Sequence, residues 1–480
     1  MSLLRHEWRL LAADRTLIVT ASLLLALMVL GLYNGWRFTH ELTARQEAIA
    51  AEETARRAQL AHQAEALLQA KDDSIPAWKS PTRPFPVGNR LVQPMATLPP
   101  GPLNAFAIGQ LDLLPTSFQV SLLGQVADFG QEPLDHPAHL STGSLDLAFV
   151  LLYLLPLFVL ALSFDLLSRE HEDGTLRLVL VQAGSLRRWV LGRLVVRALT
   201  VLGLCALAGG AGYLVTGASG GMARLLAWMG LVAAYGAFWF ALALAVNALG
   251  RGSATNALLL VSLWLLMVVV IPAAVQLGVS QLYPVPSRVA LVGAARQAAA
   301  EAEKEGSQLL ARYYQDHPEL APQDGKADTF LPTYLAVQSE AARRTAPVLE
   351  SFQTQLTHQQ QMLGALRFLS PALAFQQALQ DVAGTGHSRH AHFLQQVSVF
   401  HEDWRSALLP RAFAQQVLGA EAHHGLPRFT WREQPVAEAL SAAAVGLLAL
   451  LLPTIAALTF GLLRLRRYPV GGSGFPASTG

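Results

Sequence analysis

The stretch Ser168-Arg-Glu-His-Glu-Asp-Gly-Thr-Leu-Arg177 is dense in charge, yet it lies between two apolar runs, 145–166 and 190–215. A helix needs about 20 apolar residues to cross a hydrocarbon core roughly 30 Å thick, and both runs are long enough. A short polar segment held between two membrane spans is a place where a membrane protein can take force from a soluble partner. The function of this chain therefore depends on which side of the membrane the segment faces and what contacts it.

The composition is that of a membrane protein. Of the 480 residues, 52% are hydrophobic and 14% are charged, whereas roughly 25% are charged in an ordinary soluble domain. The net charge of +2, with no basic stripe interleaved with aromatics, argues against a nucleic-acid partner. We predict an all-α polytopic membrane protein with six transmembrane helices, at 17–36, 145–166, 190–215, 225–249, 257–277 and 437–463.

The N-terminal segment 1–16 is amphipathic, with leucines and a tryptophan set among arginines and acids. The apolar run that follows is of full span length and ends in the aromatic residues Tyr33 and Trp36. A cleaved signal peptide has a shorter apolar region and a small-residue cleavage site. We therefore expect 1–16 to be an interfacial helix on the cytoplasmic surface, followed by an uncleaved first span.

Arginines near the ends of the spans predict the orientation. They precede span one, lie between spans two and three, follow span four, and follow span six. All these groups fall on one side of a six-span arrangement, and basic residues mark the cytoplasmic side. We expect both termini, the segment 167–189 and the tail 464–480 to be cytoplasmic.

Two long segments, 37–144 and 280–436, are then predicted to form a mainly helical, bipartite extracytoplasmic domain. Their apolar periodicity favours helices at 41–71, 288–314 and 334–368. Ser370-Pro371 predicts the start of a further helix, with serine as the N-cap and proline at the first helical position. Within the spans, Pro156, Pro272 and Pro453 predict kinks.

The charged segment itself combines a turn with charges of both signs. Gly174 allows a sharp backbone turn. Acidic and basic side chains on either side of it could steer a soluble partner. The alternative is a solvated loop that follows the tendency of basic residues to stay inside.

The run Arg169-Glu-His-Glu-Asp-Gly-Thr-Leu-Arg-Leu-Val-Leu, followed by Ser185-Leu-Arg-Arg-Trp-Val-Leu-Gly-Arg193, resembles the signature of ABC-2 type transporter permeases. In that family an E-x-E-x-G-T-L stretch precedes a leucine-rich turn and an arginine-containing entry to the third span. Two departures are Ala183, where the family usually has proline, and Arg193, where lysine is frequent. The residues assigned to coupling with an ATPase are Glu170, Glu172, Asp173, Gly174, Thr175, Leu176, Arg177, Arg187, Arg188 and Arg193.

The six spans and the insertions after spans one and five resemble one subfamily of these permeases. The resemblance implies a permease dimer, made with a second copy or a paralogue, in the bacterial inner membrane. It implies a cytoplasmic ABC ATPase dimer that binds ATP and Mg and docks on the segment after span two. This chain has no G-x-x-x-x-G-K-[ST] motif, so we expect no catalytic residue and no cofactor in it.

A metal site is the weaker interpretation of the external histidines His387, His390, His392 and His401, which with Glu402 fit a polar helix or turn. Asp165, Asn247 and Asn256 lie near span ends, where snorkelling or capping explains them.

Three functions remain open. The first is the permease subunit of an ATP-driven exporter of an unidentified substrate. The second is mechanical transmission, in which ATP hydrolysis reshapes the extracytoplasmic domain and nothing crosses between the spans. The third is a membrane-anchored scaffold or sensor without an ATPase. Membrane lipids are expected contacts in every case, and an extracytoplasmic partner protein is a further candidate.

Overall fold

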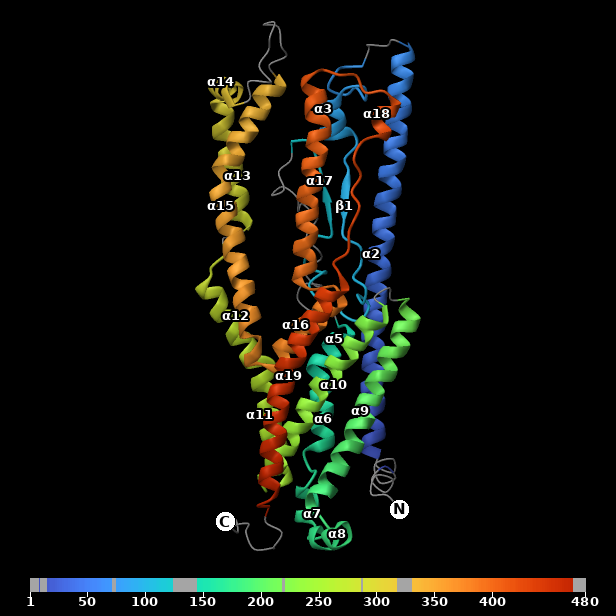
Figure 1. Cartoon of the computed structure of the whole chain (residues 1–480), viewed down its shortest axis with the longest axis vertical. Helices are drawn as coiled ribbons and strands as arrows, with labels where there is room; N and C mark the ends of the chain where they lie inside the picture. The colour runs from blue at the N-terminus through green and yellow to red at the C-terminus, as the bar shows by residue number, and fades with distance from the viewer. Residues whose placement is uncertain are drawn as a thin grey trace.

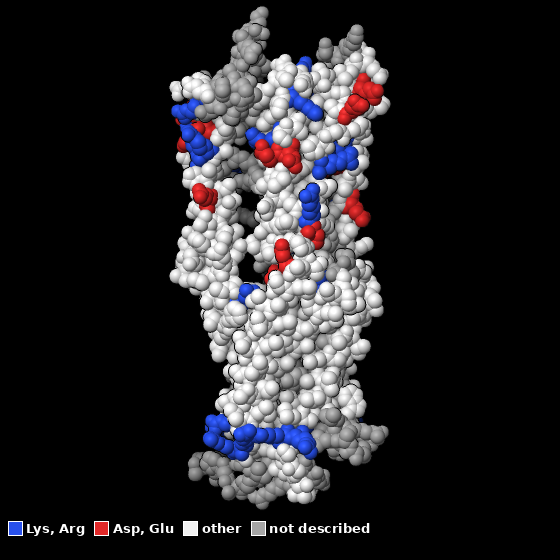
Figure 2. Space-filling model, viewed as in Figure 1, with Lys and Arg blue, Asp and Glu red and all other residues white. Residues whose placement is uncertain are grey.

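The computed structural model describes residue 8 and residues 15–70, 75–123, 145–217, 221–285, 288–316 and 330–468. The molecule is elongated and mostly helical (Figure 1), with an apolar bundle toward one end and a part that carries more charge at the other (Figure 2). Apart from Trp8 and residues 15–16, the predicted interfacial helix 1–16 lies outside the described residues. So do residues 124–144 of the first insertion and residues 469–480 of the tail.

Six helices are long and apolar enough to cross a membrane, which confirms an all-α, multi-pass membrane protein. The second and fifth are each interrupted by one π-helical turn, Val150–Leu154 and Leu266–Val270. In chain order the spanning helices are α2 (Arg15–Ala70), α5 with α6 (Leu147–Phe149, Leu155–Ser163), α9 (Leu186–Thr216), α10 (Gly221–Asn247), α11 with α12 (Ser253–Leu265, Ile271–Leu282) and α19 (Val436–Leu465).

Helix α10 is the centre of the bundle. Of its most apolar stretch 72% is buried, against 17% in the fifth spanning helix. The bulky side chains of Trp228, Tyr235 and Trp239 are fully buried along it. Helices α6, α9, α11 and α19 pack against α10, whereas α2 packs against α5, α6 and α9, and the spanning helices expose apolar side chains on their outer faces.

The first helix does not end where its apolar run ends. Helix α2 continues without a break from Arg15 to Ala70, so the predicted span 17–36 and the predicted helix 41–71 are one element. Gly35 lies inside it because the backbone of Ala105 packs there: a Cβ at Gly35 would lie 2.1 Å from the Ala105 carbonyl oxygen. The glycine in this helix is therefore a site of close packing and not a helix end.

The polar part has two columns (Figure 1). One contains α13, α14 and α15, and the other contains the distal half of α2, a two-stranded antiparallel sheet and α17. The sheet pairs Ala96 with Phe118, and Trp404 of α17 donates to the Gly88 carbonyl at 2.9 Å. The bounds are α3 Pro84–Pro86, β1 Met95–Thr97, β2 Ser117–Gln119, α13 Arg288–Lys304, α14 Gly306–Asp316, α15 Phe330–Leu366, α17 His387–Phe413 and α18 Ala420–His424.

Helix α16 (Pro371–Ala383) links the two parts of the molecule. It falls inside the predicted external insertion 280–436, yet Phe375, Ala378 and Leu379 are buried in the same core as the spanning helices. With 13 residues it is too short to register as a span by hydropathy. Its predicted start is confirmed, because Ser370 is the N-cap and accepts from the Ala372 N–H.

The charges divide the surface into zones. Figure 2 shows a band of basic side chains at the end of the molecule where α2 begins and α19 ends, and charges of both signs on the polar part. A broad zone between them carries almost no charge on this face. The exposed arginines at the basic end include Arg169, Arg188, Arg251, Arg464, Arg466 and Arg467.

Candidate functional site

The charged segment folds as two short helices joined by a glycine. Helix α7 (Ser168–Glu172) continues span two, Gly174 turns the chain with a φ of +69°, and α8 (Leu176–Ala183) follows. Gly184, also at φ +69°, ends α8 before α9 begins. L-residues with side chains avoid this backbone region, so both turns favour glycine. Helix α8 lies at the basic end of the molecule, beyond the bundle (Figure 1).

Glu170 connects this segment to span three. Its Oε1 lies 3.0 Å from Nη1 of Arg193 in α9, and the Thr175 hydroxyl donates to its Oε2 at 3.0 Å. The Arg193 side chain is 11% exposed and also donates to the Leu166 carbonyl. A carboxylate paired with a largely buried guanidinium fixes the position of α7 against α9.

Glu172 connects the same segment to span five. Its Oε1 accepts the Ser253 N–H at 2.7 Å, and its Oε2 lies 2.8 Å from the Ser253 hydroxyl. Ser253 is the first residue of α11, so Glu172 caps the N-terminus of that helix from another helix. Ser168 joins the contact, with its hydroxyl 2.8 Å from that of Ser253.

A second layer of polar contacts lies just inside this end of the bundle. Asp165 pairs with Arg197 at 3.5 Å and with Arg169 at 3.8 Å. Asn247 donates to the Ser163 carbonyl at 2.9 Å and accepts the Leu167 N–H at 3.3 Å. These groups hold the end of span two against spans three and four, so they are more than end caps.

The remaining predicted coupling residues have different surroundings. Leu176 is buried in the bundle core at 3% exposure, whereas Asp173 and Arg188 are exposed and Arg187 is partly buried. The side chain of Arg177 lies outside the described residues. The outward surface of α8 is instead apolar, with Leu178 65% exposed and Val181 84% exposed.

The assignment of Glu170 and Glu172 to ATPase coupling stays a prediction, and the structure adds their contacts within the chain. They bind spans three and five of their own chain, whereas the outward surface belongs to residues that we did not assign from the sequence. A helical pattern at 176–183 with Leu178 and Val181 three residues apart could have indicated that surface. Nothing in the sequence pairs Glu172 with Ser253, 81 residues away.

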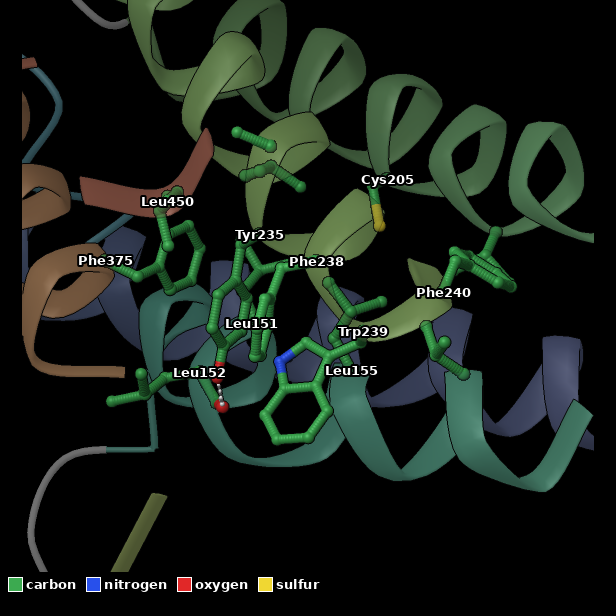
Figure 3. Close-up of a cluster of buried hydrophobic side chains, with 14 of the residues drawn as sticks. Leu151, Leu152, Leu155, Cys205, Tyr235, Phe238, Trp239, Phe240, Phe375 and Leu450 are labelled. Carbon is green, nitrogen blue, oxygen red and sulfur yellow. Dashed lines mark hydrogen bonds between the residues drawn. The ribbon is translucent and has the colours of Figure 1, made fainter. Parts of the chain in front are cut away.

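Further from this end, span two contains a π turn just before Pro156. Proline lacks an N–H, so Pro156 cannot donate the backbone hydrogen bond that the Leu152 carbonyl would accept in an α-helix. The Tyr235 hydroxyl of α10 supplies one at 2.9 Å (Figure 3). The neighbouring Tyr153 carbonyl accepts from Nε1 of Trp264 in span five at 3.2 Å.

Span five contains a matching π turn before Pro272. In a π turn the Met267 carbonyl would accept from the N–H of residue 272, which proline lacks. The Ser370 hydroxyl, at the start of α16, donates to this carbonyl instead. Each of the prolines predicted to kink spans two and five therefore follows a π turn, and a side chain of another helix donates to one carbonyl of that turn.

One aromatic pair joins these two turns through α16. Tyr235 stacks on Phe375 with ring centroids 4.1 Å apart and ring planes at 7° (Figure 3). Tyr235 bonds the π turn of span two, and α16 carries Ser370, which bonds the π turn of span five. The side chains that bond the two π turns therefore both belong to α16 or pack against it.

The histidines have hydrogen-bond or ring partners in the polar part. His390 lies 3.0 Å from the Pro115 carbonyl, His387 lies 3.2 Å from Gln360, and the His392 ring contacts Trp431. Within the described ranges, no group of three or more His, Cys, Asp or Glu residues could hold a metal ion.

Comparisons with known proteins concern the second half of the chain. No curated protein and no solved structure matches any part of the chain. Residues 288–432 match a family model described as a domain of unknown function, DUF3526. The match begins with α13 and ends just before α19, so it includes α16 and α17 together with the column of α13, α14 and α15.

Proposed function

We propose that this chain is the permease subunit of an ABC-2 type exporter in the inner membrane of a bacterium. It would couple ATP hydrolysis by a separate cytoplasmic ATPase dimer to export of a substrate. The partner ATPase would hold ATP and Mg, and a second permease copy or paralogue would complete the membrane part. The polar part would be the bipartite extracytoplasmic domain, where a partner protein could bind.

The observation that carries the proposal is the position of α8. It presents Leu178 and Val181 outward at the basic end, while Glu170 and Glu172 fix α7 to spans three and five. An exposed apolar helix face suits a groove on a soluble partner. A partner that moved α8 would act on three spans through these contacts.

The distribution of arginine supports a cytoplasmic position for α8. At the end where α2 begins and α19 ends the exposed charges are mostly arginines, whereas the polar part carries charges of both signs, and a basic excess of this kind marks the cytoplasmic side of membrane proteins. Both termini would then be cytoplasmic, and the ATPase would reach α8 directly.

A second candidate function is mechanical transmission, and the contacts of α16 favour it. The π turns of spans two and five both bond partners that meet at α16, and α16 leads directly into α17 of the polar part. Movement at the cytoplasmic end could therefore reshape the polar part without passage of a substrate through the bundle.

Binding of the ATPase tests the proposal. The full-length chain is co-expressed with the ATPase encoded beside it, and the complex is isolated from detergent through a tag on the chain. Val181→Glu should reduce recovery of the ATPase at least tenfold, because it places a charge on the docking face. Val399→Glu, at an exposed position on α17, is the matched control. Equal recovery with both variants would refute docking on α8.

Locking α16 separates the two candidate functions. A cross-link introduced between α16 and span five should abolish movement of the polar part and leave ATPase docking intact. ATP-driven transport of a substrate by vesicles with this lock in place would support export. Absence of transport by the unlocked protein, together with ATP-driven movement of its polar part that the lock abolishes, would support transmission.

A further inference from the structure

A small cavity lies where α10, α16, α17 and α19 meet, at the boundary between the apolar bundle and the polar part. Its volume is about 170 Å³. Most of its polar lining comes from charged side chains, namely Arg224, Asp381, Arg389, Glu433 and Glu438.

One charge pair in this lining is already complete. Arg389 bonds Glu433 through Nε at 2.8 Å and Nη2 at 2.7 Å, and its Nη1 donates to the Pro99 carbonyl at 3.0 Å. Trp431 also donates to Glu433 at 3.1 Å. Burial acts to raise the pKa of Glu433, but these hydrogen bonds and the nearby guanidinium charges outweigh it and hold the pKa below its ordinary value. The charges of Arg389 and Glu433 therefore cancel in this part of the cavity lining.

The guanidinium of Arg224 makes fewer hydrogen bonds within the described part of the chain than that of Arg389. It is 3% exposed, in the first turn of spanning helix α10, and its Nη1 donates to the Val382 carbonyl at 3.0 Å. Among the described residues this is its one hydrogen bond, so other guanidinium N–H groups are free for a ligand in the cavity. A buried guanidinium with unused donors favours an anionic group.

Two carboxylates line the same cavity. Asp381 is partly buried near the end of α16, and Glu438 is exposed in the first turn of α19. Within the described part of the chain no hydrogen bond reaches the Asp381 carboxylate. A Cβ at Gly386 would lie 2.3 Å from Asp381 Oδ1, so glycine makes room for the carboxylate there. Burial raises the pKa of Asp381 to about 6, against the opposing charge of Arg367.

We propose that this cavity binds a phosphoethanolamine headgroup, with the phosphate on Arg224 and the primary ammonium between Asp381 and Glu438. Once Arg389 and Glu433 have neutralised each other, one cation and two carboxylates remain, which suits a ligand bearing both charges. The positive end of α10 adds to the attraction for phosphate. A quaternary ammonium is bound by aromatic side chains, and no aromatic residue lines the described cavity.

The position of the cavity favours a lipid as the source of the headgroup. Arg224 begins a spanning helix, which is the height of lipid phosphates in a bilayer. Exposed apolar side chains lie on the same two spanning helices two residues after lining residues, with Leu226 following Arg224 on α10 and Leu440 following Glu438 on α19. These surfaces can contact acyl chains while the headgroup occupies the cavity. The inference depends on the membrane-spanning arrangement and not on an ATPase.

Native mass spectrometry of the full-length chain tests this site. The protein is released from nanodiscs that contain equal amounts of phosphatidylethanolamine, phosphatidylcholine and phosphatidylglycerol, and the retained lipid is measured. The wild type should retain phosphatidylethanolamine at least tenfold over the other two. Asp381→Asn should abolish this preference and Arg224→Gln should lower retention of the lipids at this site altogether, whereas the control Arg188→Gln, at the opposite end, should keep both retention and preference.

Three results would overturn the proposal. Equal retention of phosphatidylcholine would contradict recognition of a primary ammonium, and equal retention of phosphatidylglycerol would contradict the role of the carboxylates. Saturable binding of soluble phosphoethanolamine without lipid retention would contradict the lipid source. Because Arg224→Gln removes a buried contact, its folding is checked by thermal unfolding. Glu438→Gln, at an exposed position, gives an independent test and should weaken the preference.

Discussion

Glu172 at the end of α7 caps the first residue of α11, Ser253, with one carboxylate oxygen 2.7 Å from its N–H and the other 2.8 Å from its hydroxyl. This contact joins spans two and five at the end where α8 is exposed. Together with the Glu170–Arg193 pair it makes the charged segment a rigid connection to the bundle.

Removal of this cap should loosen the joint between spans two and five. Glu172→Ala leaves the Ser253 N–H without its acceptor, and loss of a capping group costs about 1–2 kcal/mol. We expect a lower unfolding temperature in detergent, measured by the fluorescence of the tryptophans. Asp173→Ala changes an exposed neighbouring acid and should have little effect. Equal destabilisation by both would contradict the assigned contact.

Exchanging the charges of Glu170 and Arg193 should cost less stability than reversing one of them alone. Glu170→Arg alone places two guanidinium groups together in a partly buried position and should destabilise the bundle. The double variant Glu170→Arg with Arg193→Glu restores opposite charges and should recover part of that loss. A double-mutant cycle in thermal unfolding measures the coupling. Strict additivity of the two single changes would argue against a direct interaction.

Ser370 should stabilise the fold through two hydrogen bonds of its hydroxyl. Ser370→Ala removes the N-cap of α16 and the donor to the Met267 carbonyl in the π turn of span five. We expect a loss of about 1 kcal/mol or more in stability. Faster hydrogen exchange should be seen in both α16 and residues 266–270. The control Ser398→Ala removes a hydroxyl that bonds only within α17, and it should leave both segments unchanged.

The stability of the chain should depend on pH through Asp381. Its pKa rises from 3.8 in its ordinary state to about 6 in the fold, because burial disfavours the charged form. The stability that protonated Asp381 contributes is fully present below about pH 4 and is lost as the pH rises through about 6. The folded state then gives up a proton that it holds more tightly than the unfolded state does. Lipid-free wild type should therefore lose stability between pH 4 and 6.5, and Asp381→Asn should lose less. Parallel pH profiles of the two proteins would contradict this assignment.

Hydropathy and spacing predicted the spans and the start of α16, because a span needs a long apolar run and Ser370-Pro371 is a local signal. The same local reasoning did not predict that α2 continues to Ala70, because the packing of Ala105 on Gly35 is a long-range contact. It also did not predict that α16 packs against the core of the spanning helices, since 13 residues do not reach the length of a span although Phe375 is fully buried there.

The candidate site could be located from the sequence but its contacts could not. The pattern around Gly174 identified the segment and its turn, which the φ of +69° bears out. The partners of Glu170 and Glu172 lie 23 and 81 residues away, and no periodicity encodes such pairs. The spacing of Leu178 and Val181 could have indicated that they share one face of α8, but not that this face is exposed, because apolar residues near a span are usually buried against it.

The most direct test of the central claim is photocross-linking in living cells from a photoreactive residue at position 181. The account predicts a cross-link from this position to a protein that carries the G-x-x-x-x-G-K-[ST] nucleotide-binding motif, identified by mass spectrometry. A photoreactive residue at position 399 should give no such product. Failure to capture an ATP-binding protein at position 181, or its equal capture at 399, would contradict the claim that α8 receives force from a cytoplasmic ATPase.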